Sequence, residues 1–272
     1  MIAYLIIILF FGIAKGFTCD EFCLLSSDKY SCLNSTAHAR ADLLNVFLRG
    51  CMNRVMVFIG DSVLHQLYKT LICMLCGLTA VSFTNGESIV RIHDPWNITF
   101  KYNWIQWGIY QHHTRSILSQ EPKSAAVVVN FGLHYNEYKN KPPREHDRSD
   151  LVTHLIDLDK DISEAHSNIF FMETTPQHFS GSDNGYYNLN RGQDCVPVNN
   201  GTYRQDRDWR NSVLNGTLSK MKIIEVANRL FPLWSKHVGN GGDCTHWCPE
   251  ALNLLTEIVL KQVYEKVCVT HP

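Results

Sequence analysis

The sequence predicts an α/β protein, a three-layer α/β/α sandwich around a mainly parallel sheet of about five strands. Three observations favour this fold class. The chain has 272 residues, 45% of them hydrophobic and 19% charged, which suits a folded domain with a substantial core. Short apolar runs rich in β-branched residues recur along it, as in buried parallel strands. Helical patterns lie between several of these runs, so the strands are expected to be joined by right-handed crossovers.

The first strand is expected at residues 55–59, where an apolar run stops at Gly60 and Asp61. A helix should follow directly, because leucines recur there at spacings of three and four and Gly77 is placed to end the pattern. Similar runs predict further strands at residues 79–83, 125–131, 168–172 and 222–226. Further helices are expected at residues 150–166, 206–219 and 249–267.

Three segments fit this alternation less clearly. Residues 19–51 contain cysteines and no clear strand, and are interpreted as an N-terminal cap attached to the body. Residues 88–119 carry Trp96, Trp104 and Trp107 in a polar setting. We interpret this segment either as an insertion that helps to form a cleft or as a cover for the edge of the sheet. Residues 181–201 are rich in Gly and Asn, which predicts a long loop, either near a site or on an unrelated surface.

The N-terminus resembles a secretory signal peptide at residues 1–16. Residues 2–14 are uncharged but too short for the ~20 residues of a membrane-spanning helix. Ala14 and Gly16 are the small residues that a signal peptidase requires for a cut before Phe17. Residues 17–272 would then form a single catalytic domain. The alternative is an uncleaved membrane anchor, and only in that case is the membrane a partner.

The cysteine content also predicts the secretory pathway, with the protein secreted or retained in the Golgi lumen. Ten cysteines are expected to form disulfides in an oxidising compartment, with a connectivity that spacing alone does not determine: Cys19, Cys23, Cys32, Cys51, Cys73, Cys76, Cys195, Cys244, Cys248 and Cys268. Four Asn-x-Thr sequons are candidate glycosylation sites and add weaker support: Asn34, Asn97, Asn200 and Asn215.

The charge balance argues against one class of partner. The 25 Lys and Arg residues and 26 Asp and Glu residues give a net charge of −1. Binding to a phosphate backbone requires a positive surface. We therefore expect no nucleic-acid partner.

Two short segments carry residues suited to nucleophilic catalysis. Ser62 follows the first strand and begins a helix, where free N–H groups favour negative charge, although a serine in this place is often only a helix cap. Asp243 and His246 stand three residues apart, so one loop could supply a general base and the carboxylate that orients it. The competing interpretation is a zinc site made of Cys244, His246 and Cys248 with Asp243 or His237, but oxidation of the thiols argues against it, and no metal is expected.

The sequence resembles the plant trichome-birefringence-like and PC-esterase proteins, a branch of the SGNH hydrolases that includes polysaccharide O-acetyltransferases. The likeness is spread over segments whose residues match family motifs: 19–22 (CDEF), 47–50 (FLRG), 57–62 (VFIGDS), 71–75 (LICML), 130–132 (NFG), 170–179 (FFMETTPQHF) and 243–248 (DCTHWC). The chain departs from the family at His65 and Gln66, where Arg and Asn are usual, at Met172, where Arg is usual, and after residue 248. These departures bear on acceptor specificity and leave Ser62, Asp243 and His246 in place.

The resemblance implies an SGNH-like fold and a catalytic triad of Ser62, His246 and Asp243. It also implies an oxyanion hole formed by the backbone N–H of Ser62, Gly86 and Asn130, with Asn136 in reserve. The expected activity is transfer of O-acetyl groups on carbohydrate, with an acetyl donor as co-substrate and no cofactor. A secreted carbohydrate acetylesterase would use the same triad.

The sequence also allows other roles for the whole protein and for three of its histidines. A non-catalytic glycan-binding or structural protein could retain this scaffold. His178 could touch the acyl donor or acceptor, or be a structural histidine. His112 and His113 are expected on a solvated face.

Overall fold

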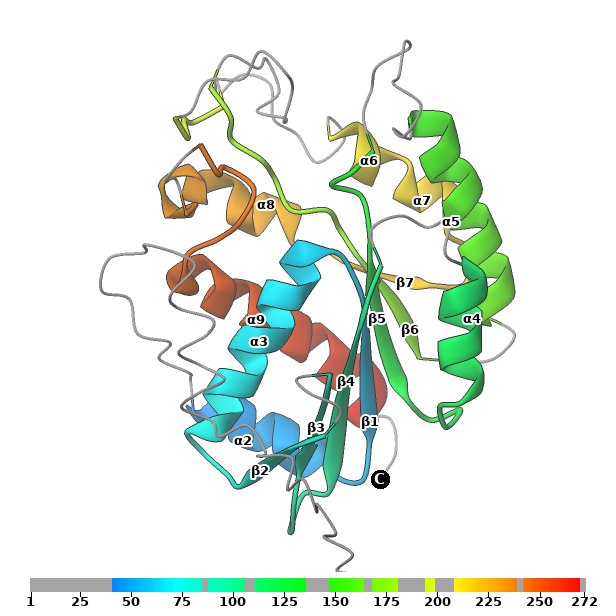
Figure 1. The fold of residues 1–272 in the computed structure, drawn as a ribbon, viewed down its shortest axis with the longest axis vertical. Coiled ribbons are helices and arrows are strands. Elements are labelled where there is room, and N and C mark those ends of the chain that lie inside the picture. The colour runs from blue at the N-terminus through cyan, green and yellow to red at the C-terminus, as the bar shows by residue number, and fades with distance from the viewer. Residues whose placement is uncertain are drawn as a thin grey trace, which may run out of the picture.

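The computed structural model describes residues 41–84, 88–105, 111–135, 147–163, 168–180, 194–198, 208–238 and 242–269. Within them a seven-stranded sheet runs in the order β2-β3-β4-β1-β5-β6-β7 (Figure 1). The strands are β1 (Val55–Gly60), β2 (Val81–Thr84), β3 (Ile89–Ile92), β4 (Ile98–Trp104), β5 (Ala126–Asn130), β6 (Ile169–Met172) and β7 (Lys222–Ile224). Strands β4, β1, β5, β6 and β7 are parallel, whereas β2 and β3 pair antiparallel at one edge. The carboxyl ends of the parallel strands therefore meet at one end of the molecule.

Helices cover both faces of the sheet, as the predicted three-layer architecture requires (Figure 1). One face carries α2 (Ala41–Gly50), α3 (Ser62–Cys76) and α9 (Pro249–Val263). The other carries α4 (Gln111–Ser119) and α5 (Arg148–Ser163), with the short α6 (Trp209–Ser212) and α7 (Leu214–Thr217) beside them. The remaining elements are α8 (Ala227–Leu230), the 3-10 helix η2 (Phe231–Lys236) and the π-helical segment η3 (Tyr264–Cys268).

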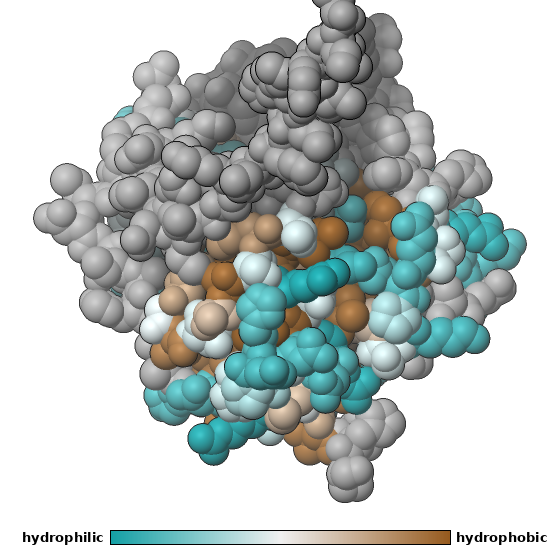
Figure 2. All heavy atoms as spheres, turned by 60° about the horizontal axis from the view of Figure 1, so that its bottom comes forward, coloured by the Kyte–Doolittle hydropathy of each residue, from teal (hydrophilic) through white to brown (hydrophobic). Residues whose placement is uncertain are grey.

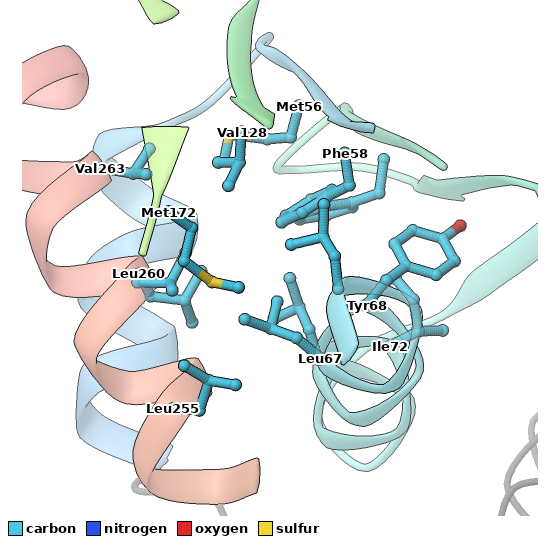
Figure 3. Close-up of a cluster of buried hydrophobic side chains, with 14 of the residues drawn as sticks. Met56, Phe58, Leu67, Tyr68, Ile72, Val128, Met172, Leu255, Leu260 and Val263 are labelled. Atoms are coloured by element: carbon cyan, nitrogen blue, oxygen red, sulfur yellow. The ribbon is translucent and has the colours of Figure 1, made fainter. Parts of the chain in front are cut away.

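The core consists of two apolar clusters separated by the sheet. Because successive side chains of a strand point to opposite faces, Met56 and Phe58 of β1 belong to one cluster and Val57 and Ile59 to the other. Figure 3 shows the first cluster, in which side chains of β1, β5 and β6 meet those of α3 and α9. This packing fixes the start of α3 relative to the sheet.

The predicted α/β/α fold with a mainly parallel sheet is confirmed, and the described sheet has seven strands where about five were expected. Residues 88–119, interpreted as an insertion or an edge cover, supply β3 and β4, and β4 lies beside the central β1. Buried and half-exposed side chains alternate along β4, so it lacks the continuous apolar run that marks the other parallel strands. Strand β3, between β4 and the edge strand β2, has only four residues.

The other expected elements agree with the structure apart from their ends. The helix expected at residues 206–219 is two short helices, α6 and α7, which meet at Val213, and Asp208 caps the first. The helix expected at residues 249–267 is α9 followed by η3. Within the region interpreted as an N-terminal cap, residues 41–50 form α2, and residues 19–40 lie outside the described part.

Disulfides occur as the cysteine content predicted. Cys51 and Cys268 join α2 to the end of η3, and we call this bridge the terminal disulfide. Cys195 and Cys244 form the loop disulfide. The other described cysteines are disulfide-bonded as well: Cys73, Cys76 and Cys248. Cys19, Cys23 and Cys32 lie outside the described residues. Disulfides are typical of an oxidising, secretory-type compartment.

Several predictions about the surface and the leader stay open. Asn97 and Asn215 are exposed, whereas Asn34, Asn200 and the expected signal peptide lie outside the described residues. No helix in the described part of the chain is long and apolar enough to cross a membrane.

Figure 2 brings forward the end opposite the strand carboxyl ends, where hydrophilic and hydrophobic residues lie side by side on the described surface.

Candidate active site

The turn after β1 places Ser62 at the first position of α3. Asp61 caps the helix, since its Oδ1 accepts a hydrogen bond from the Val63 N–H at 3.0 Å. The Asp61 N–H donates to the Asn130 carbonyl at the end of β5, at 3.3 Å. A Cβ atom on Gly60 would lie 2.4 Å from that same carbonyl oxygen, so only glycine allows the two strands to come this close. The half-buried Ser62 therefore stands at a helix N-terminus, where negative charge is favoured.

The Asp61 carboxyl group is fully buried beneath this turn. Burial raises its pKa to about 6, against the opposing effects of the Val63 and Leu64 N–H groups and of the charges of His246 and Arg210. Its Oδ2 has no hydrogen-bond partner among the described residues. The electrostatic effect of His246 and Arg210 on Asp61 means that both lie near the turn that carries Ser62.

The segment before α9 holds Asp243 and His246 in the arrangement of an oriented base. The Asp243 Oδ2 lies 2.7 Å from the His246 Nδ1, and its Oδ1 accepts from the N–H groups of Thr245 and His246. Burial raises the pKa of Asp243, but these hydrogen bonds and the charge of His246 outweigh it and lower the pKa to about 2. An ionised carboxylate can only accept a hydrogen bond, so the proton of neutral His246 is on the Nδ1 that faces it, and the basic nitrogen is Nε2. Gly242 enters this segment with a φ of 79°, which favours glycine.

Gln66 links this segment to α3. Its Oε1 accepts from the Trp247 N–H at 3.2 Å and its Nε2 donates to the Trp247 carbonyl at 3.4 Å. Gln66 lies one turn after Ser62 on the same face of α3, and Trp247 follows His246 directly. The two hydrogen bonds therefore hold the His246 segment against the N-terminal part of α3. In the sequence Gln66 is only a departure from a family motif, and nothing there indicates this role.

The sulfur atoms near His246 are in disulfides. Cys244 forms the loop disulfide with Cys195, and Cys248 is also disulfide-bonded. The Cys248 N–H donates to the Lys236 carbonyl at 2.8 Å, which further ties the segment to η2. Sulfur in a disulfide is not a thiolate ligand, so the zinc site considered from the sequence lacks the ligands it requires.

A buried polar chain approaches the same segment from α6. The Arg210 guanidinium, only 2% exposed, forms an ion pair with Asp208 and donates to the Gln177 Oε1 at 3.3 Å. The Gln177 Nε2 in turn donates to the Thr245 Oγ1 at 2.8 Å. Arg210 was not predicted as a site residue, because its position inside an expected helix gives no sign of which groups it meets.

His134 is a second unpredicted residue close to the site. Burial, together with the charges of His246 and Arg210, lowers its pKa to about 4. A ring with this pKa is neutral at physiological pH. His134 can therefore serve near the site only as a neutral hydrogen-bonding group.

The candidate oxyanion donors are placed as follows. The backbone N–H of Ser62 lies in the first turn of α3, where N–H groups have no intrahelical acceptor. Asn130 ends β5 beside Gly60, and its Nδ2 donates to the carbonyls of Met172 at 2.9 Å and Glu173 at 3.3 Å. Its role in an oxyanion hole stays a prediction, and would require one of these bonds to be exchanged. Gly86 and Asn136 lie outside the described residues.

His178 is placed as a structural histidine. The side chain is fully buried, and both ring nitrogens are hydrogen-bonded, one to His237 and one to the Phe231 carbonyl. This favours the structural alternative over contact with an acyl group. The side chains of His112 and His113 lie outside the described part.

No protein-family model matches the chain, and no curated protein matches it. A search of solved structures finds the crystal structure of the lipase/acylhydrolase from Enterococcus faecalis, with 14% identity and a TM-score of 0.47, over 79% of this chain and 97% of that chain. The fold assignment rests on the sheet order and the helix layers described above.

Proposed function

We propose that the protein is a serine-dependent acyl-transfer enzyme of the SGNH type that acts on O-acetyl groups of carbohydrate. The observation that carries this proposal is the 2.7 Å contact between Asp243 Oδ2 and His246 Nδ1, in a segment that Gln66 binds to the helix beginning at Ser62. Covalent acyl transfer needs three groups: a nucleophile, here at a helix N-terminus, a histidine with a basic Nε2, and a carboxylate that orients this histidine.

The proposed reaction has two halves that mirror one another. In the first, the Ser62 Oγ attacks the acetyl carbonyl carbon while its proton passes to the His246 Nε2. The tetrahedral intermediate then collapses, the C–O bond to the leaving alcohol breaks, and His246 returns the proton to that oxygen. In the second, an incoming hydroxyl gives its proton to His246 and attacks the acetyl-serine, which regenerates Ser62. An acetyl donor is the co-substrate, and no cofactor takes part in these steps.

Negative charge develops on the carbonyl oxygen in both halves. The Ser62 N–H and the N-terminal end of the α3 dipole lie where they can stabilise it. The ionised Asp243, whose Oδ2 lies 2.7 Å from the His246 Nδ1, would hold the ring in place and stabilise the positive charge that it carries during each proton transfer. The buried Arg210 also acts on Asp61 at the turn before Ser62, but its ion pair with Asp208 compensates its charge.

An exposed aromatic side chain supports a sugar as the acceptor. Trp104 ends β4 in register with Gly60, so it lies one strand from the turn of Ser62, and it is 51% exposed. His65 stacks on Tyr102 with ring centroids 4.5 Å apart and meets the edge of Trp104 at 6.3 Å. Sugar rings stack on exposed aromatic faces through their C–H groups. Trp104→Ala should raise KM for an oligosaccharide acceptor about tenfold and leave hydrolysis of a small aryl acetate unchanged.

The deciding experiment measures both products of acetyl transfer. The purified protein is incubated with an aryl acetate donor, with and without oligosaccharide acceptors, and free acetate is compared with acetylated sugar. Acetylated sugar as the main product supports the transferase that we favour, whereas free acetate alone supports the alternative, a secreted carbohydrate acetylesterase. If neither free acetate nor acetylated sugar is formed, the result supports the second alternative, a glycan-binding or structural protein without catalysis.

The role of Ser62 is tested in the same assay. An activated serine-directed probe should label Ser62, and Ser62→Ala should abolish labelling and turnover while the thermal midpoint stays close to that of the parent. Ser119→Ala is the matched control, because the Ser119 Oγ donates only to the Ser116 carbonyl on α4. A Ser62→Ala protein that keeps normal turnover would refute the proposal.

A further inference from the structure

Two neighbouring residues of α6 bind the buried segment that follows β6. This segment, residues 173–178, has no regular secondary structure and is buried throughout, so its main-chain polar groups need partners inside the protein. The Asn211 Oδ1 accepts from the Thr174 N–H, and the Asn211 Nδ2 donates to the Thr174 carbonyl, both at 2.9 Å. The Arg210 guanidinium donates to the Gln177 Oε1 at 3.3 Å. Helix α6 therefore holds the 173–178 segment at two points, three residues apart.

The same segment contacts the residues that lead into His246. The Gln177 Nε2 donates to the Thr245 Oγ1 at 2.8 Å, and the His178 N–H donates to the Cys244 carbonyl at 3.2 Å. Cys244 and Thr245 are the two residues directly before His246. Their positions therefore depend on the 173–178 segment and, through it, on α6.

His246 is thus held from both faces of the sheet. On the face that carries α3, Gln66 bonds to Trp247, the residue after His246. On the other face, where Trp209 of α6 belongs to the second apolar cluster, the support reaches the residues before His246. Figure 1 shows α6 and the start of α3 at the same end of the molecule. A main chain that is bound on both sides of one residue restricts the positions that its side chain can take.

Arg210 also decides the orientation of the Gln177 amide. A guanidinium has only donors, so the amide oxygen must face Arg210 and the amide NH2 group is left to face Thr245. The planar guanidinium binds several groups at once, which lets it meet both carboxylate oxygens of Asp208 at 3.1 Å and Gln177 as well. A lysine ammonium is a point charge on a flexible stem and lacks this fixed fork of donors.

Stability alone does not account for the ion pair at this place. Asp208 is fully buried and Arg210 is 2% exposed. Removing two charges from water is costly, and apolar residues of similar volume often replace a buried ion pair without loss of stability. The Asp208 Oδ1 also accepts from the main-chain N–H of Arg210, so the cap of α6 does not need the guanidinium. The contact from Arg210 to Gln177 gives the charged side chain a task that an apolar one cannot perform.

We propose that Arg210 is a positioning residue for His246 and that it acts through the Gln177 side chain on Thr245. The effect on turnover rests on the proposed function of His246, whereas the effect on the position of His246 does not. The line of contacts ends on the segment that bears the base. Breaking it should therefore lower kcat with little change in KM.

The first test is a double-mutant cycle on turnover of an aryl acetate. Arg210→Lys keeps a charge beside Asp208 but loses the fork, and Gln177→Met keeps the length of the side chain but loses the amide. Each should lower kcat about tenfold, as the loss of about one buried hydrogen bond in the transition state would do. The double variant should lose no more than either single variant, because both break the same line of contacts. Losses that multiply to about a hundredfold would overturn the proposal, since Arg210 would then act independently of Gln177.

Variants of Thr245 test the far end of the line and leave the ion pair of Arg210 intact, so they apply even if Arg210→Lys fails to fold. Thr245→Val removes the hydroxyl that accepts from Gln177 and should also lower kcat about tenfold, whereas Thr245→Ser keeps the hydroxyl and should restore most of the turnover. Gln262→Met is the matched control, because the Gln262 Nε2 donates to the Glu225 carbonyl, away from His246. Parental kcat in both Thr245→Val and Gln177→Met would contradict the positioning role.

The second test follows His246 without catalysis. A histidine N–H that donates to a carboxylate gives a low-field proton signal in NMR, and the absence of this signal from the His246→Gln protein assigns it to the His246 Nδ1. In Arg210→Lys and Gln177→Met this hydrogen should exchange with water about tenfold faster, because His246 is held less firmly, while Gln262→Met keeps the parental rate. Parental exchange in both variants would overturn the proposal even if kcat falls. This measurement stands even if Ser62→Ala refutes the proposed function, so the two failures are distinguishable.

Discussion

Replacing Asp243 with asparagine separates the two tasks that its carboxylate performs. Oδ1 accepts from the N–H groups of Thr245 and His246 at 3.1 and 3.0 Å, which caps the turn. Oδ2 faces the His246 Nδ1 at 2.7 Å. In Asp243→Asn the amide oxygen must stay on the Oδ1 side, because turning it would place the amide hydrogens against two N–H donors. The amide nitrogen then faces Nδ1 and donates to it.

The substitution should therefore cost much turnover and little stability. A donor opposite Nδ1 makes that nitrogen the acceptor and moves the ring proton to Nε2, which then cannot take the proton of Ser62. The same change in an unrelated serine protease costs about 10⁴ in turnover. The cap is retained, so only the charged hydrogen bond is weakened, at about 1 kcal/mol, or roughly 2–4 °C of thermal midpoint for a chain of this size.

The assay is turnover of an aryl acetate together with the thermal midpoint of the same protein. Asp147→Asn is the matched control, because the Asp147 Oδ1 likewise accepts from two N–H groups, those of Ser149 and Asp150 at the start of α5. Both variants should lose similar stability, and only Asp243→Asn should lose turnover. Activity within a few fold of the parent, with a lowered midpoint, would show that Asp243 is a cap and not part of a triad.

Three further predictions concern the supports of the site. Gln66→Met should lower turnover about tenfold and stability by about 2 kcal/mol, because it leaves a buried N–H and a carbonyl unpaired; parental kinetics would contradict this. Asp61→Asn should raise the thermal midpoint at pH 7 but not at pH 4. Burial raises the pKa of Asp61 from 3.8 to about 6, so the folded chain holds the extra proton and loses up to about 3 kcal/mol of stability as pH rises through this window. Equal midpoint changes at both pH values would exclude this linkage. Replacing Cys195 and Cys244 with serine should lower turnover at temperatures where the protein is still folded, whereas the same change in the terminal disulfide should lower stability alone; a reversed result would show that the loop disulfide does not support the site.

The elements predicted best from the sequence are those whose signal is local. The run at residues 55–59 and the leucine spacing after it are visible within one segment, and the structure has β1 and α3 there. Asp243 and His246 could be paired in advance because they stand only three positions apart in one turn. Strand β4 was not predicted, because its amphipathic pattern, with Trp104 exposed at its end, differs from the continuous apolar pattern of the buried parallel strands.

The supports of the site could not be predicted, because each joins segments far apart in the chain. Gln66 and Trp247 are 181 residues apart, and His178 and His237 are 59 apart. Nothing in the composition of either partner indicates the other, since a glutamine on a helix or a histidine in a loop usually faces water. Only the sheet order, which brings the ends of β1, β5 and β6 together, makes these groups neighbours. The candidate catalytic residues therefore lie in short motifs that can be recognised, while the residues that hold them are determined by topology. For this reason a motif alone gives the chemistry of such a site but not the geometry that its rate depends on.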